Sequence, residues 1–383
     1  MNSRAVKKQS EQYLPNNTAA DMERQNIVMF IHLFCLAAIL KLLHYLLPEC
    51  IVSYYLCAAN WLLFLNLAVF SFEFLKQWYF VETVPTTNKA VLITGCDSGF
   101  GHHLARRLDS KGFQVFATCL LPKGVGSMEL QRTCSKNLKI IPLDVTKDDS
   151  VNSAVESVKK HLGTSIFWAL VNNAGVYKGF CLDMSTVEDV RANMEVNALG
   201  LVRVTKAFLP LLRQSKGRIV NVTSLGGKLS NAFLMPYCMS KFAAVAFTEC
   251  IAYELKHWGI KAISVEPEAF RTPLIAYENR FAEIEDSLCN LPDDIRHTLG
   301  NQYQKRLEAL CYLYWKSSTV KLDAVLNDLE AAVCLKYPSS VYKPSRNFFV
   351  KMIIYVFERL PMGILSSIFD FYLWALIPPL KGK

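Results

Sequence analysis

The sequence lacks the features that mark metal sites, disulfide frameworks and disordered chains. Its 12 cysteines stand at irregular spacings, with no C-x-x-C pair and no Cys/His cluster at metal-ligand spacing. The common zinc motifs are therefore excluded, and reduced thiols facing the cytosol are expected rather than a disulfide framework. Charged residues make up only 20% of the 383 residues and hydrophobic residues 52%. Intrinsic disorder, which needs low hydrophobicity and high net charge, is excluded as well.

The chain has a net positive charge but no motif of nucleic-acid-binding proteins. The formal net charge is +9, but anionic membrane surfaces attract Lys and Arg as well as nucleic acid does. Internal repeats and low-complexity segments are also missing from the sequence. We therefore expect a membrane as a partner, and no nucleic acid.

The excess of apolar residues is concentrated near the N-terminus. Residues 26–47 and 50–72 are each long enough, as helices, to cross a hydrocarbon core of about 30 Å. A signal peptide would be shorter and would end in a small-residue cleavage site, and buried core helices would keep a polar stripe. We expect a hairpin of two transmembrane helices after a polar leader at 1–25. Basic residues in that leader favour a catalytic domain on the cytoplasmic side, at the endoplasmic reticulum or, as the alternative, a mitochondrial membrane.

The C-terminal segment, residues 346–383, is also apolar, but charged residues, Pro361 and Gly363 interrupt it. No uninterrupted apolar stretch of about 18 residues occurs, so a third membrane span is not expected. Amphipathic helices that lie in the membrane interface or line an apolar substrate entry fit this pattern. Packing against the protein core is the alternative.

Beyond residue 87, short β-branched runs alternate with stretches of helical periodicity. The runs are KAVLITG, QVFATC, KIIPLDV, WALVNNAG, GRIVNVTS and KAISVEPE, and the helical stretches are 99–111, 147–162, 199–214 and 237–258. This alternation predicts an α/β fold with a doubly wound, Rossmann-type parallel sheet, whose ligand lies at the carboxyl ends of the strands. The expected parts are a linker at 73–87, the catalytic domain at 88–275, and a substrate lid with the last sheet elements at 276–345.

The first strand runs directly into a glycine-rich turn, residues 94–101, with the spacing G-x-x-x-G-x-G. Glycines at such a strand-to-helix turn let the backbone close tightly and approach a pyrophosphate. The N-terminus of the following helix stabilises that anion with its free N–H groups and its dipole. The turn therefore predicts a dinucleotide site.

Tyr237 and Lys241 form a Y-x-x-x-K pair inside a helical stretch, so both side chains lie on one face of the helix. The phenol of Tyr is a poor base at neutral pH. A neighbouring ammonium and a positive nicotinamide ring would favour the phenolate. Ser224 ends a strand 13 residues before Tyr237 and is placed to hydrogen-bond the oxygen of a substrate.

Taken together, these motifs resemble the short-chain dehydrogenase/reductase family. The resemblance covers about residues 88–345 and is strongest to the branch of retinol, hydroxysteroid (estradiol 17β-dehydrogenase-like) and 3-hydroxybutyrate dehydrogenases. It implies that Tyr237 is the acid/base, that Ser224 orients the substrate oxygen and that Asn197 supports a proton relay through water and Lys241. Lys241 would also lower the pKa of Tyr237 and hold the nicotinamide ribose.

The same resemblance implies a nicotinamide cofactor and no metal. Asp144 would meet the adenine, Asn172 the adenine ribose side and Thr272 the nicotinamide carboxamide. The full set of implied cofactor-binding residues is Gly95, Ser98, Gly99, Phe100, Gly101, Asp144, Val145, Asn172, Ala174, Gly175, Tyr237, Lys241, Pro267 and Thr272.

The sequence departs from the family pattern in two places. Glu268 follows Pro267 where the family has Gly, which puts cofactor geometry or the level of activity in question. The strand that ends at Cys119 and Leu120 lacks the acidic residue that binds the ribose hydroxyls of NAD. It also lacks an Arg for the phosphate of NADP, although Lys123 is near. Resemblance to the oxidative members favours NAD and leaves NADP open.

The segment between Ser224 and Tyr237 is apolar apart from Lys228, and residues 279–312 are expected to cover the substrate. An apolar wall beside a membrane anchor fits a lipophilic alcohol such as a steroid or a retinoid. A hydroxy acid would need a cation for its carboxylate, and Lys228 and Arg271 are candidates, so a 3-hydroxybutyrate-type dehydrogenase is the alternative. A catalytically weak scaffold that binds cofactor is a further alternative, and a homodimer is left open.

Overall fold

The computed structural model describes residues 31, 34–35, 37–39, 41, 54–79, 81–231, 233–291, 293–361, 363–365 and 368. The chain divides into two compact units, Met1–Val81 and Glu82–Lys383. The second unit contains the whole predicted catalytic domain and the predicted lid.

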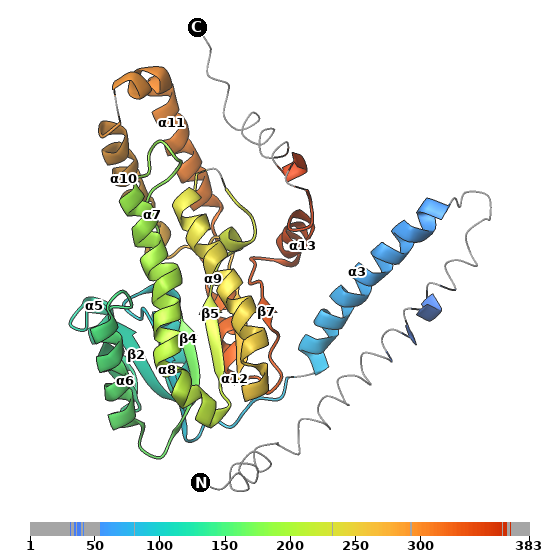
Figure 1. The fold of residues 1–383 in the computed structure, drawn as a ribbon, viewed down its shortest axis with the longest axis vertical. Coiled ribbons are helices and arrows are strands. Elements are labelled where there is room, and N and C mark those ends of the chain that lie inside the picture. Colours follow the sequence, from blue (N-terminus) through green and yellow to red (C-terminus); the bar gives the residue numbers. More distant parts are fainter. Residues whose placement is uncertain are drawn as a thin grey trace, which may run out of the picture. The chain divides into compact units, whose positions relative to one another are not determined.

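In the first unit, helix α3 runs from Tyr54 to Tyr79 (Figure 1). It continues past the predicted span at 50–72 into the predicted linker, taking in Glu73 and Lys76. The other predicted span, 26–47, lies mostly outside the described residues. Among the residues that the structure describes, no helix combines the length and apolarity needed to cross a bilayer. The described structure therefore does not support the predicted hairpin of transmembrane helices.

The second unit is built on a sheet of seven parallel strands in the order β3-β2-β1-β4-β5-β6-β7. The strands are β1 (Lys89–Ile93), β2 (Gln114–Cys119), β3 (Leu138–Pro142), β4 (Ile166–Asn172), β5 (Arg218–Val222), β6 (Lys261–Val265) and β7 (Val341–Tyr342). The predicted doubly wound parallel sheet is confirmed. Because the strand order reverses between β1 and β4, a crevice is expected at the carboxyl ends of these strands.

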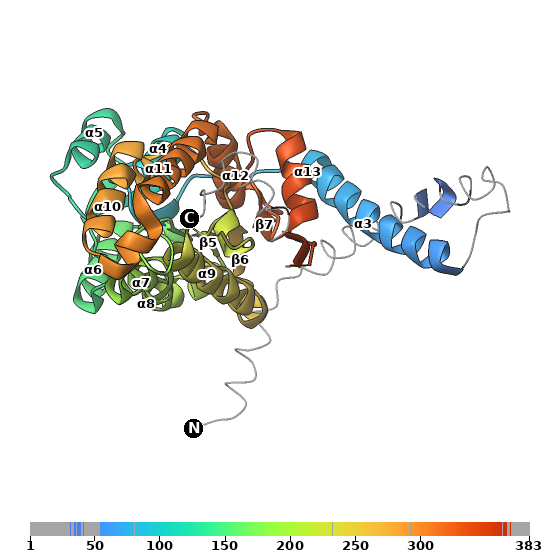
Figure 2. The ribbon, with the colours of Figure 1, turned by 90° about the horizontal axis from the view of Figure 1, so that it is seen from above.

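Helices cover both faces of the sheet (Figure 2). The helices of the catalytic unit up to β6 are α4 (Gly99–Ser110), α5 (Val125–Thr133), α6 (Asp148–Leu162), α7 (Val187–Met194), α8 (Leu201–Ser215) and α9 (Met235–Glu254). Along β1 the side chains alternate, so Val91 and Ile93 pack with α4 and α12 (Asp323–Cys334), while Ala90 and Leu92 pack with α6, α8 and α9. The two hydrophobic cores bury the strands on both sides, which explains their unbroken apolar runs.

The helix predicted at 199–214 is preceded by a turn of π-helix that the sequence did not predict. A π-helical turn, Glu195–Gly200, precedes α8 and contains Asn197. Short π segments inside helices are frequent at functional sites, because the extra residue changes the direction of the side chains in that turn. The turn places Asn197, which is only 1% exposed, against the loop that follows β4.

The predicted lid is a pair of helices, α10 (Tyr277–Cys289) and α11 (Asp293–Ser317). These helices share a small core of their own with the segment after β4, made of Phe180, Met184, Ile284, Leu291 and Leu307. Helix α13 (Phe348–Phe357) follows β7. The lid is therefore anchored to the strand end beside the crevice.

Candidate active site

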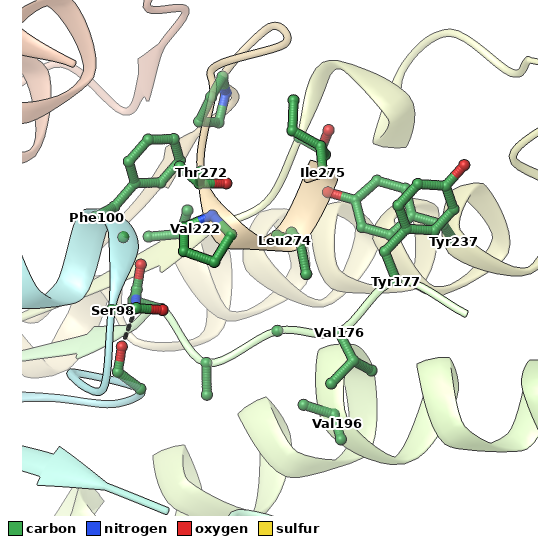
Figure 3. Close-up of a pocket in the computed structure, with 18 of the residues that line it drawn as sticks. Ser98, Phe100, Val176, Tyr177, Val196, Val222, Tyr237, Thr272, Leu274 and Ile275 are labelled. Atoms are coloured by element: carbon green, nitrogen blue, oxygen red, sulfur yellow. Dashed lines mark hydrogen bonds between the residues drawn. The ribbon is translucent and has the colours of Figure 1, made fainter. Parts of the chain in front are cut away.

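A cavity of about 480 Å³ lies at the carboxyl ends of the central strands. Figure 3 shows Ser98 and Phe100 of the glycine turn toward one end of this cleft and Tyr177 and Tyr237 toward the other. Most of the residues predicted to form the site line it: Gly95, Ser98, Gly99, Phe100, Asp144, Val145, Ala174, Gly175, Ser224, Tyr237, Lys241, Pro267 and Thr272. One cleft therefore brings together strand ends that lie far apart in the sequence.

Three predicted residues lie behind the lining. Gly101 is buried in the first turn of α4. Asn172 donates hydrogen bonds from Nδ2 to Thr205 Oγ1 at 3.0 Å and to Asn221 Oδ1 at 2.9 Å, within the buried layer under the cleft. Asn197 is the third, held by contacts described below. The structure brings these residues close to the site without placing them in the wall of the cavity.

The glycine turn fits the pyrophosphate of a dinucleotide. Gly95 has a φ of +69°, and a Cβ atom at this position would lie 2.9 Å from the Cα of Ala174, so only glycine allows the turn to lie this close to β4. Helix α4 starts at Gly99, and the Ser98 side chain does not cap it. The unpaired N–H groups of its first turn are therefore left for an anion, which the helix dipole also favours.

The Tyr and Lys of the Y-x-x-x-K pair meet at the other end of the cleft, as the helical spacing predicts. The Lys241 Nζ atom lies 5.7 Å from the centroid of the Tyr237 ring and donates a hydrogen bond of 2.9 Å to the carbonyl oxygen of Val222, at the end of β5. Ser224 follows two residues later and lines the same cleft as Tyr237, and its Oγ accepts the Gly226 N–H at 3.1 Å. Strand β5 and helix α9 thus fix all three groups relative to one another.

Burial controls the protonation of both groups in the protein without a ligand. Removal from water raises the pKa of Tyr237 to about 12, and the hydrogen bond with Ser224 opposes this shift. Removal from water also lowers the pKa of Lys241 to about 8. Lys241 is only 4% exposed. At pH 7 the ammonium therefore remains charged, although the protein holds it in a position that disfavours the charge.

Asn197 joins the loop after β4 to helix α9. Its Nδ2 donates to the Val176 carbonyl oxygen and to Ser240 Oγ, both at 2.9 Å, and its Oδ1 accepts the Val176 N–H at 2.8 Å. Ser240 in turn donates to the Tyr237 carbonyl oxygen at 2.7 Å. All of these side-chain hydrogen bonds fix backbone next to Lys241. The role of Asn197 in a proton relay stays a prediction.

Glu268, which stands where the family has Gly, lines the cleft but forms an ion pair outside it. Its carboxylate accepts from the Arg346 side chain, with 2.9 Å between Nη2 and Oε2 and 3.1 Å between Nε and Oε2. Arg346 also donates to the carbonyl oxygen of Ser317, the last residue of α11. Arg346 thereby links the loop after β6 to the end of the lid. It also stands next to Asn347, the residue that caps α13.

Sequence reasoning missed several residues of the cleft wall. Asp97, Leu121, Asn173, Tyr177 and Tyr314 all line it. Asp97 and Asn173 stand inside motifs that the sequence did reveal, so their positions carried a signal. Tyr314 lies just beyond residues 279–312, the part expected to cover the substrate, and it belongs to α11.

Comparisons with known proteins agree with this geometry. The model of the family described as short chain dehydrogenase matches residues 89–282. Estradiol 17-beta-dehydrogenase 2 of Mus musculus is 38% identical over 270 residues, which cover 69% of this chain and 70% of the mouse protein. The mitochondrial D-beta-hydroxybutyrate dehydrogenase of Rattus norvegicus is 38% identical over 275 residues, or 70% of this chain and 80% of the rat protein. The chain belongs to the short-chain dehydrogenase family.

A solved short chain dehydrogenase/reductase from Burkholderia phymatum, in complex with NAD, shares the fold of this dehydrogenase. It has a TM-score of 0.57 at 20% identity and covers 71% of this chain and 93% of its own. Family membership and the fit of the glycine turn together make the protein an NAD(P)-dependent alcohol dehydrogenase. The comparisons leave the choice between NAD and NADP to the chemistry of the site.

The buried ammonium leads to a prediction in which stability and activity change in opposite directions. Lys241→Met removes a charge that burial disfavours, so at pH 7 the free energy of unfolding should rise by on the order of 1–3 kcal/mol. Alcohol oxidation should fall by about 100-fold or more because the charge beside Tyr237 is lost. Urea unfolding and initial rates measure the two effects.

The pH dependence of that difference follows from the lowered pKa. Below about pH 8 the buried Lys241 is charged and lowers the free energy of unfolding of the wild-type protein. This cost disappears as the pH rises from about 8 toward 10.5, the ordinary pKa of a lysine. The stability advantage of Lys241→Met should therefore shrink between pH 7 and pH 10. Lys206→Met, at an exposed position on α8, is the matched control and should change neither quantity. A Lys241→Met variant less stable than wild type at pH 7 would contradict the prediction.

The ion pair of Glu268 and Arg346 should show strong coupling. Glu268→Ala leaves Arg346 without its carboxylate partner and should lower the free energy of unfolding by about 2–4 kcal/mol, since Glu268 is only 5% exposed. The double variant Glu268→Ala/Arg346→Ala should be less destabilised than the sum of the two single variants. A double-mutant cycle by urea unfolding measures the coupling. Additive effects would show that the pair contributes no net interaction.

Proposed function

We propose that this dehydrogenase acts on a lipophilic alcohol or carbonyl compound, of the hydroxysteroid class first and of the retinoid class second. The observation that carries the proposal is the wall of the cleft around Tyr237. Its apolar and aromatic side chains are Leu234 and Tyr314, together with Val176, Tyr177, Val196, Leu274 and Ile275, which Figure 3 labels. Such a wall gains free energy from burying an apolar ring system.

The positions of the basic side chains argue against a small hydroxy acid. Among the described residues that line the cleft, Lys241 is the only Lys or Arg. Lys228 is paired with Glu249, and Arg271 stacks on Trp315 at 4.2 Å and donates to the carbonyl oxygens of Trp315 and Lys316. Neither candidate cation therefore faces the substrate, and a carboxylate would be buried without a partner.

The named relatives do not decide between the two substrate classes by similarity alone. The mouse estradiol 17-beta-dehydrogenase 2 and the rat D-beta-hydroxybutyrate dehydrogenase are each 38% identical to this chain. The distribution of charge in the cleft is what favours the first class. A carboxylate substrate needs a fixed cation, whereas a steroid needs one donor for the reacting oxygen and apolar area elsewhere.

The residues near that oxygen support an acid/base role for the tyrosine. The nicotinamide ring, when bound, supplies the acceptor or donor of hydride. In the oxidative direction the Tyr237 hydroxyl, as phenolate, takes the proton of the alcohol, and the Ser224 hydroxyl donates a hydrogen bond to the same oxygen. The Lys241 ammonium, 5.7 Å from the centroid of the Tyr237 ring, is a positive charge placed to favour the phenolate.

A substrate panel with a wall variant tests this proposal. Protein in detergent is offered estradiol, retinol and 3-hydroxybutyrate with NAD and with NADP, and reduced cofactor is followed by absorbance. The highest kcat/KM is expected with estradiol. Leu234→Arg should lower that kcat/KM by about 10-fold or more, because a cation is forced against an apolar ligand, while Leu182→Arg, at a position that is 75% exposed and outside the cleft, should not.

The other outcomes of the panel each contradict part of the proposal. Preference for 3-hydroxybutyrate would assign the hydroxy-acid class. If the Tyr237→Phe variant still oxidised the alcohols at the wild-type rate, the proposed acid/base role of Tyr237 would be refuted. Absence of any turnover in a protein that still binds cofactor would favour the catalytically weak scaffold.

We also propose that the lipophilic substrate arrives from a membrane surface through helix α13. One stripe of this helix, Phe349, Ile353 and Val356, is 78%, 52% and 48% exposed, at the i, i+4 and i+7 spacing of a single face. Ile354, on another face, is 8% exposed and packs inward. Lys351, near the start of α13, and Arg359, two residues beyond its end, add basic charge to this segment, which suits an anionic surface.

A kinetic test separates delivery from catalysis. With estradiol dissolved in anionic vesicles, Phe349→Glu/Ile353→Glu should raise KM by about 5-fold or more with little change in kcat, because the stripe no longer enters the interface. Leu182→Glu, an equally exposed apolar-to-acidic change, should leave KM as in wild type. An unchanged KM in the α13 variant would refute delivery through this helix.

A further inference from the structure

A carboxylate from another part of the chain lies at the end of β2. Strand β2 ends at Cys119 and is followed by Leu120 and Leu121, without an acidic residue. The side chain of Asp97, from the glycine turn after β1, reaches this point. Its Oδ2 accepts the Leu120 N–H at 3.0 Å and its Oδ1 accepts the Leu121 N–H at 2.9 Å. A charged group therefore occupies the strand end where dinucleotide folds place the acid that meets the adenine ribose.

The surrounding backbone holds Asp97 in this position. A Cβ atom on Gly126, in the first turn of α5, would lie 2.0 Å from the Asp97 carbonyl oxygen, so α5 packs directly against the backbone of the glycine turn. The Leu121 carbonyl oxygen accepts from Ser127 Oγ at 2.7 Å and from the Gly124 N–H at 2.8 Å. The turn that supplies both N–H donors is thus itself fixed, and the carboxylate is in place before any ligand binds.

The charges of the described lining differ between the two ends of the cleft. Asp97 and Asp144 line the end next to β2 and β3, and no Lys or Arg among the described lining residues stands with them. Lys241, the one cation of that lining, lies beside Tyr237, and the third lining acid, Glu268, is paired with Arg346. Lys123, the basic residue near β2 in the sequence, is exposed and outside the described lining. A group bearing about two negative charges, such as a phosphate monoester, would meet only like charge at the β2 end.

We propose that Asp97 makes the enzyme select NAD over NADP. The carboxylate excludes the 2′-phosphate of NADP by charge, and each of its oxygens keeps a lone pair that can accept a hydroxyl of the NAD ribose. The proposal rests on membership of the dehydrogenase family and is independent of the substrate class proposed above. It assigns to a residue of the glycine turn the function that a residue at the end of β2 has in the general dinucleotide fold.

Cofactor affinity, measured without turnover, tests the proposal. Full-length protein in detergent is titrated with NADH and with NADPH, and the dissociation constants are read from dihydronicotinamide fluorescence. Wild-type protein should bind NADH about 100-fold or more tightly than NADPH at low salt. Asp97→Asn, which removes the charge and keeps the shape, should narrow that ratio by about 10-fold, chiefly through tighter NADPH binding.

Salt dependence separates charge exclusion from a structural effect. In wild type the penalty against NADPH should shrink when the ionic strength is raised from about 0.05 M to about 1 M, because screening weakens the repulsion. In Asp97→Asn the ratio should depend less on salt. Lys123→Gln is the control and should leave both dissociation constants within about 2-fold, since Lys123 does not line the cleft.

Three results would overturn the proposal. NADPH binding as tight as NADH binding in wild type would show that no selection exists. Equal weakening of both cofactors in Asp97→Asn would show that Asp97 only shapes the turn. A change of the ratio in Lys123→Gln would transfer the role to that lysine. If Asp97→Asn lowers Tm strongly, Leu120→Arg, which keeps Asp97 and adds a cation at the same strand end, decides: tighter NADPH binding supports the assignment and unchanged binding refutes it.

Discussion

The burial of one ammonium group determines much of how this active site is built. Lys241 is 4% exposed, and its Nζ donates to the carbonyl oxygen at the end of β5. A cation in such a place is costly unless backbone dipoles and hydrogen bonds are fixed around it. The surrounding structure provides them: the π-helical turn holds Asn197 against Val176 and Ser240, and Ser240 holds the backbone of Tyr237. The same burial lowers the pKa of Lys241 to about 8, so the group is still charged at neutral pH but lies closer to titration than an exposed lysine.

The fold could be predicted from the sequence wherever the pattern is local. Strands buried on both faces must be apolar throughout, and the runs that contain β1 to β6 were visible for that reason. The last sheet elements were expected within 276–345, but strand β7 could not be located there, because two residues carry no period and its pairing with β6 joins Ser264 to Val341. The apolar residues at 50–72 predicted a helix but not its bounds, since the helix continues through polar residues to Tyr79.

The same distinction separates what the sequence revealed of the site from what it did not. The glycine turn and the Tyr–Lys pair depend on geometry within a few residues, so spacing alone predicted that they would line one cleft. The partner of Glu268 is Arg346, 78 residues away, and the partners of Asp97 are the backbone N–H groups of Leu120 and Leu121, just after strand β2. No periodicity links such residues. Only the structure explains the unexpected Glu268: Arg346, just before α13, pairs with it and also binds the end of the lid.

The arrangement of charge gives the cleft a direction. In the described lining, Asp97 and Asp144 lie at the β2 and β3 ends and Lys241 lies beside Tyr237, while the third acid, Glu268, is paired with Arg346. A pyrophosphate is favoured by the helix end, and Asp97 and Asp144 place like charge where a further phosphate would bind. The wall around Tyr237 is largely apolar, which suits a substrate that carries no charge.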